Sequence, residues 1–131
     1  MERKYLAQII ATDKEGLQLI SAYSSGARVK VSNIKYLGSN KVFLLSLERI
    51  KIEESKQTKK INSICRFDFV DSVKSKNINQ LNREMTLELL GIDYLKNKDD
   101  YEINLIFSNN AHIVLSTEAL EIRLEDQSEI K

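Results

Sequence analysis

Residues 101–124, YEINLIFSNNAHIVLSTEALEIRL, decide how the fold is interpreted, because apolar and polar side chains alternate on both sides of an asparagine pair. A period of two is typical of strands with one buried face. Asn109 and Asn110 tolerate the left-handed conformation that tight turns require. The stretch therefore predicts a β-hairpin.

The same pattern predicts the length of the hairpin loop. A two-residue loop would place Ile113 on the polar face, whereas an odd loop, for example 109–111, pairs Phe107 with Ile113 and leaves His112 exposed. Beyond this strand the apolar positions change from odd to even numbers. We therefore expect an odd loop and a bulge at 117–119.

A helix is predicted after the first apolar run. Thr12 and Glu15 have the spacing of a capping box, apolar residues recur at helical spacing as far as Ser24, and Gly26 suits the left-handed position after a helix end. Most other apolar patterns alternate as strands, over 5–11, 29–36, 43–52, 65–74 and 85–94.

Further changes of apolar parity, at 48–49 and 90–91, predict bulges that bend and twist their strands. We expect an α+β fold in which one N-terminal helix packs on a strongly bent, mainly antiparallel sheet of about six or seven strands. A half-barrel is an open alternative. Residues 1–131 should form a single domain, with an exposed loop at 53–60 and a tail at 126–131.

Composition agrees with one globular domain. The chain has 131 residues, of which 42% are hydrophobic, and this is enough for a real core. The N-terminal apolar run is too short for a signal peptide or a membrane span. The single cysteine, Cys65, cannot form an internal disulfide. We expect a cytoplasmic protein that does not enter a membrane.

The sequence contains no catalytic or metal-binding motif. The only histidine, His112, and the only cysteine, Cys65, do not make a zinc site of the usual type, and the four glycines stand singly rather than in a phosphate-binding loop. His112 is interpreted as a solvated strand residue and Cys65 as a buried thiol. We expect no catalytic residue, no metal and no cofactor.

Charge is unevenly distributed along the chain. Residues 28–60 carry nine Lys/Arg and three Asp/Glu, a net +6, while residues 85–131 carry four and ten, a net −6. The total of +1 disfavours nucleic-acid binding, because such domains are usually strongly basic. In one compact domain we expect the two halves to neutralise each other.

The polar face of the predicted Cys65 strand is the candidate binding surface, with Arg66, Asp68, Ser72 and Lys74 as its residues. Two hypotheses stay open. The first is a non-enzymatic protein-binding or adaptor domain that uses a sheet edge or this face to hold a partner protein or a second copy as a homodimer. The alternative is a small-ligand or anion-binding module on the concave face of the sheet.

Several blocks of the chain resemble a known family. They are LAQIIATDKEGLQLISAYSSGARVKVSNIKYL, RFDFVDSVKSKNI, LELLGIDY and INLIFSNNAHIVLSTEALEIRLED. In order and spacing they are similar to the bacterial family called domain of unknown function 2948, over nearly the whole chain. The resemblance implies a small soluble bacterial protein and supplies no functional residue. The chain departs from the family pattern in having Lys74 and Lys76 at expected arginines and Ile50 and Ile52 at an expected aromatic strand end.

Overall fold

The computed structural model describes residues 8–52 and 58–130, and it confirms the α+β class. The predicted number of strands is wrong, because the sheet contains ten. The helical elements are α1 (Lys14–Ser24) and the short 3₁₀ turns η1 (Val31–Asn33) and η2 (Gly38–Asn40). The strands are β1 (Gln8–Ala11), β2 (Ala27–Lys30), β3 (Ile34–Leu37), β4 (Val42–Ile52), β5 (Thr58–Phe67), β6 (Val70–Lys76), β7 (Thr86–Lys96), β8 (Tyr101–Phe107), β9 (His112–Thr117) and β10 (Ile122–Ile130).

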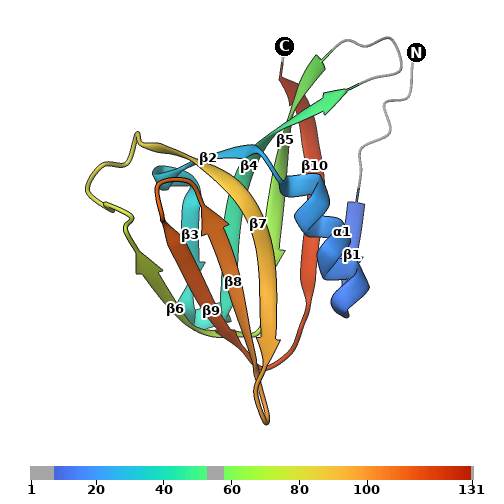
Figure 1. Cartoon of the computed structure of the whole chain (residues 1–131), viewed down its shortest axis with the longest axis vertical. Coiled ribbons are helices and arrows are strands. Elements are labelled where there is room, and N and C mark those ends of the chain that lie inside the picture. Colours follow the sequence, from blue (N-terminus) through green and yellow to red (C-terminus); the bar gives the residue numbers. More distant parts are fainter. Residues whose placement is uncertain (1–7, 53–57, 131) are drawn as a thin grey trace.

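The strands form one curved antiparallel sheet that does not close (Figure 1). Its order is β1-β10-β5-β4-β2-β7-β8-β9-β6, and β3 pairs separately with β4. Helix α1 packs against β7 on one side and β1 on the other, so that it covers the open side of the curve. The two ends of the sheet are β1 and β6.

The opening hairpin is present with an odd loop, as predicted. However, Leu105 pairs with Ile113, so the loop is 108–110 and the predicted pairing of Phe107 with Ile113 is wrong by two residues. Because the shift is even, the buried face is unchanged. Asn109 and Asn110 both have positive φ, of 61° and 58°.

The sheet has more strands than predicted because some stretches that the sequence pattern indicated as single strands are interrupted. The predicted bulge at 117–119 is instead a complete break, because β9 pairs with β8 and β6 whereas β10 pairs with β5 and β1. The predicted strand at 65–74 is broken at Phe69, which has φ 59° and is 43% exposed. Phe69 therefore turns a corner instead of sharing the buried face of Cys65.

Strand β4 contains no bulge at 48–49. Its register with β5 is continuous from Phe43 to Ile52, and the inward-facing series ends with Arg49, which is only 5% exposed. Ile50 accordingly faces solvent, at 55% exposure. The bulge predicted at 48–49 is wrong, because the alternation of inward and outward residues continues through β4 and a charged residue, Arg49, occupies one of the inward positions.

The predicted bulge in β7 is confirmed, since its register with β8 shifts between Leu89 and Gly91. Helix α1 and the turn after it supply hydrogen-bond partners for backbone groups at this bulge. Ile92 N donates to Ser21 Oγ at 3.0 Å, and Gly26 N donates to the carbonyl of Leu89 at 2.8 Å. Gly26 has φ 86°, as expected for the residue that follows a helix end.

The start of α1 differs from the predicted capping box. Asp13, not Thr12, is the N-cap, and its Oδ1 accepts a hydrogen bond from Gly16 N at 2.8 Å. A Cβ atom on Gly16 would lie 2.8 Å from the Cα of Ala11. Glycine is therefore required where the first turn of α1 crosses the end of β1.

The concave side of the sheet is filled by an apolar core, whose largest fully buried side chains include Phe43, Phe67 and Phe107. Of the two segments expected outside the sheet, 53–57 lie outside the described residues, while 58–60 begin β5 and 126–130 complete β10. Among the residues described, no helix has both the length and the apolar content needed to cross a membrane.

Candidate binding surfaces

Arg66 and Asp68, two of the predicted site residues, bind each other. Arg66 Nε donates to Asp68 Oδ1 at 3.0 Å, and the Arg66 side chain is half exposed. The neighbours of Arg66 along β5, Cys65 and Phe67, are fully buried. Arg66 therefore faces solvent on the side of the sheet opposite the core, and the pair needs no ligand to satisfy its charges.

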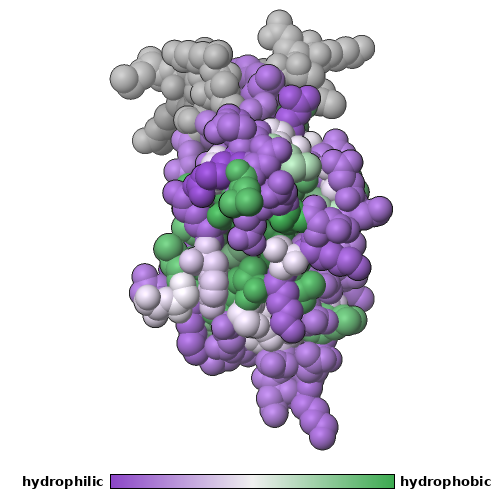
Figure 2. All heavy atoms as spheres, turned by 90° about the vertical axis from the view of Figure 1, so that its left-hand side faces the viewer, coloured by the Kyte–Doolittle hydropathy of each residue, from purple (hydrophilic) through white to green (hydrophobic). Residues whose placement is uncertain are grey.

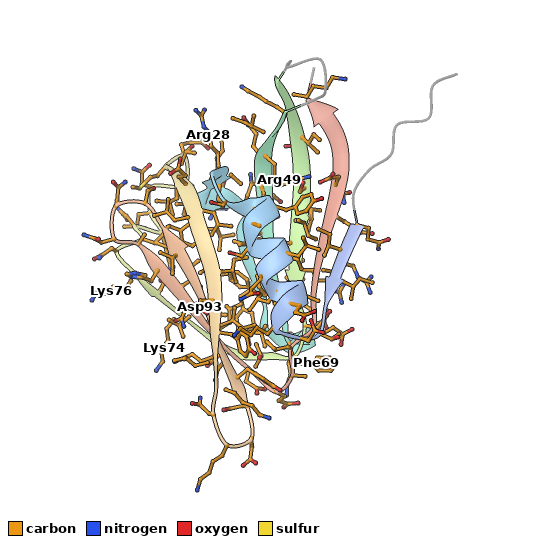
Figure 3. The ribbon with its side chains drawn as sticks, turned by 45° about the vertical axis from the view of Figure 1, so that its right-hand side comes forward. Arg28, Arg49, Phe69, Lys74, Lys76 and Asp93 are labelled. Carbon is orange, nitrogen blue, oxygen red and sulfur yellow. The ribbon has the colours of Figure 1, made fainter. Side chains whose placement is uncertain are left out.

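Ser72 and Lys74, the other two predicted site residues, lie on β6 and are exposed. Strand β6 pairs with β9, whereas β5 pairs with β4 and β10. A side-chain hydrogen bond thus joins Arg66 to Asp68, but strand pairing does not join these two residues to Ser72 and Lys74. Figure 3 shows Lys74 and Lys76 at the outer edge of the molecule, directed away from the core.

The two residues considered for chemistry lie in different environments. Cys65 is completely buried, and this burial raises the pKa of its thiol far above the ordinary value. His112 is partly exposed on the outer face of the hairpin, opposite Ile106. Within 8–52 and 58–130, no three His, Cys, Asp or Glu side chains are grouped as metal ligands.

The feature that sequence reasoning missed is a slot between two edge strands, β3 and β6. Within the described chain, β3 pairs only with β4 and β6 only with β9. The two edges meet at one end, where Val70 N donates to the carbonyl of Lys41 at 2.8 Å and Tyr36 Oη donates to the carbonyl of Val70 at 2.8 Å. Beyond Val70 they diverge, and the slot opens between them.

This β3–β6 slot has a volume of about 260 Å³ and reaches the apolar core. Figure 2, which faces the side of the molecule where β6 lies, shows apolar side chains in the middle of this face with hydrophilic ones around them. The apolar lining of the slot includes Ile34, Tyr36, Phe43, Val73, Ile78 and Ile113. The alternation in the sequence assigned Tyr36 to the core, but 37% of it is exposed.

Lys41 fixes the closed end of the slot. Its Nζ lies 3.0 Å from both Asp71 Oδ1 and Glu118 Oε1, and these carboxylates, Asp71 first, raise the pKa of Lys41. Both carboxylates near Val70 are therefore paired. The open end differs, because Lys74 and Lys76 make no ion pair within the described residues.

No curated protein and no solved structure matches the chain in the comparisons made. A family model does match, over residues 7–131 and therefore over nearly the whole chain. The blocks noted above lie within this range, except for Leu6, the first residue of the first block. The chain belongs to the family described as "Protein of unknown function (DUF2948)".

Proposed function

We propose that this protein is a non-enzymatic binding domain that holds an extended segment of a partner protein along β6. The observation that carries the proposal is the β3–β6 slot, an apolar opening flanked by two strands that each have one edge without a paired strand in the described chain. An added strand would satisfy the backbone groups of 72–76, and its alternate side chains would enter the slot. Backbone pairing would supply affinity and the slot would supply specificity.

Charge favours an acidic partner segment. Lys74 and Lys76 project from the free part of β6, and Arg83 lies at the slot. Two copies of β6 paired antiparallel would bring these lysines close together, and like charges opposite each other destabilise a sheet. We therefore favour a segment that alternates apolar and acidic residues over a second copy of this chain.

The test uses two synthetic peptides, one alternating valine with glutamate and the other alternating valine with lysine. We expect the acidic peptide to bind and to protect the amides of 72–76 from hydrogen exchange, while the basic peptide does not bind. Replacing Lys74 and Lys76 together by glutamate should reverse the preference. Leu95→Arg, on the exposed surface of β7, is the matched control and should change neither affinity.

The slot itself is tested by Val73→Arg, which places a bulky cation in the apolar opening. This variant should lose peptide binding while keeping its far-ultraviolet circular dichroism. Equal binding of the two peptides, or protection of amides outside β6 and β3, would contradict the proposal. Concentration-dependent dimerisation that protects 72–76 without peptide would instead identify a second copy as the occupant.

A further inference from the structure

A second concavity lies on the solvent side of the sheet, where the sheet splits. Strand β2 pairs with β4 only at Arg28 and Glu48, and pairing of β3 with β4 begins at Ile34 and Leu45. Residues 29–33 therefore lie opposite only 46–47 of β4. The extra residues form η1, which is held away from β4 because Val31 N and Ser32 N donate at 3.0 Å to the carbonyls of Met85 and Arg83. The gap that remains is the split-sheet hollow, with a volume of about 550 Å³.

The lining of the split-sheet hollow is mostly polar and carries two cations and one carboxylate, that of Glu48. Its other polar residues are Asn33, Ser46, Asn62 and Thr86, and the cations are Arg28 and Lys30. Register explains why they converge: Lys30 pairs with Thr86 across β2 and β7, while Glu48 joins Arg28 on one side to Asn62 on the other. All of them lie on the face opposite the core, and Figure 3 shows Arg28 directed outward from the end of β2.

Most of these side chains have hydrogen-bonding groups without a partner in the described residues. In the described parts of the chain, the side chains of Asn33, Ser46, Asn62 and Thr86 make no hydrogen bond, and Arg28 makes neither a hydrogen bond nor an ion pair. A guanidinium with all its donors available is suited to bind an oxyanion through two parallel hydrogen bonds.

The carboxylates nearby form no ion pair with Arg28 in the described chain. Glu48 lies 3.6 Å from Lys60 Nζ, and Glu84 lies 3.8 Å from Lys30 Nζ. Glu88 pairs with Arg28 across β2 and β7 but forms no ion pair with it in the described chain. The hollow therefore presents the Arg28 guanidinium, which has no ion pair in the described chain, and the loosely paired Lys30 ammonium, beside the Lys60-paired carboxylate of Glu48 and uncharged amides and hydroxyls.

We propose that the split-sheet hollow binds a small phosphate monoester that also carries hydroxyl groups, such as a sugar phosphate. Arg28 binds two phosphate oxygens, Lys30 supplies the second positive charge, and the amides of Asn33 and Asn62 bind the hydroxyls. The volume of about 550 Å³ is within the range of small-molecule sites. This site is separate from the β3–β6 slot and does not depend on peptide binding there.

The experiment titrates the labelled full chain with ribose 5-phosphate, inorganic phosphate and ribose, following backbone amides by nuclear magnetic resonance. We expect saturable shifts at 28–33, 46–48, 62 and 86, with ribose 5-phosphate binding most tightly and ribose not binding. Arg28→Ala should weaken ribose 5-phosphate at least about tenfold, which is the effect expected for losing charge-assisted hydrogen bonds. Asn62→Ala should weaken ribose 5-phosphate but leave inorganic phosphate unchanged.

Lys98→Ala is the matched control, because it removes an exposed lysine from the loop after β7 and should leave all affinities unchanged. All the substituted side chains are exposed, so each variant should keep the wild-type amide spectrum away from the hollow. The proposal is overturned if no saturable shift occurs at millimolar ligand, if Arg28→Ala binds as the wild type does, or if Lys98→Ala weakens binding as much as Arg28→Ala.

Discussion

The buried ion pair between Arg49 and Asp126 should be the most sensitive point in the fold. Arg49 Nη2 lies 2.7 Å from Asp126 Oδ1, and the two side chains are only 6% and 3% exposed. Ser63 Oγ donates to the same carboxylate oxygen at 2.6 Å and accepts from Arg49 Nε at 2.9 Å. The Arg49 guanidinium also lies over the Tyr23 ring, 5.5 Å from its centroid. These contacts join β4, β5, β10 and α1.

Asp126→Ala should destabilise the protein by about 3–5 kcal/mol, because it leaves the buried charge of Arg49 without a carboxylate. This is a large share of the roughly 5–15 kcal/mol that stabilises a typical domain. Asp68→Ala is the matched control: it breaks the exposed Arg66–Asp68 pair and should cost no more than about 1 kcal/mol. Both free energies of unfolding are measured by urea denaturation followed by circular dichroism.

Replacing the whole network tests the reason for the loss. A triple variant, Arg49→Met, Ser63→Ala and Asp126→Leu, removes the charge together with its partners and should recover most of the stability lost in Asp126→Ala. If Asp126→Ala cost less than about 1 kcal/mol, the Arg49 charge would not be desolvated and the reasoning would fail. A triple variant less stable than Asp126→Ala would show that packing, not charge, determines the loss.

Three further predictions concern local structure. Gly16→Ala should destabilise the protein by about 1–3 kcal/mol in the same urea assay, because the added Cβ would meet the backbone of β1. Gly91→Ala is its control and should change stability by less than about 1 kcal/mol, because the atom nearest to the added Cβ would be Ser21 Oγ, 3.7 Å away. Asp13→Ala should lower the free energy of unfolding by about 1 kcal/mol through loss of the N-cap. An equal loss in Thr12→Ala would favour the predicted capping box of Thr12 and Glu15 instead. The thiol of Cys65 should react with a thiol reagent only after the protein unfolds, and reaction of the folded protein at the rate of a free thiol would refute this burial. Because burial raises the pKa of Cys65 in the folded state, the contribution of Cys65 to stability is complete below the ordinary thiol pKa and falls as the pH rises above that value.

Sequence periodicity predicted most of the buried face, because burial in a sheet repeats every second residue. It identified the opening hairpin, the single helix and the bulge at Leu89–Gly91. It failed at Arg49, because the pattern predicted a bulge at 48–49 instead of a charged residue in an inward position. Only the presence of Asp126 and Ser63 around it makes the inward position tolerable, and these partners lie 77 and 14 residues away in sequence.

The binding surfaces were less predictable, because they are formed by gaps between strands rather than by a motif. The β3–β6 slot exists because Phe69 adopts a positive φ and directs β6 away from β5. The split-sheet hollow exists because residues 29–33 lie opposite only two residues of β4. Whether Arg66, Asp68, Ser72 and Lys74 bind a ligand stays a prediction, which the peptide titration tests at Lys74.

The position of β10 has a consequence for the growing chain on the ribosome. Strand β10 lies between β1 and β5, yet it is made after both. Until it emerges, β1 lacks the strand that pairs with it in the described chain, and Arg49 lacks the carboxylate of Asp126. We expect nascent chains that stop before residue 122 to be bound by chaperones and degraded, so that native structure appears abruptly as β10 leaves the exit tunnel.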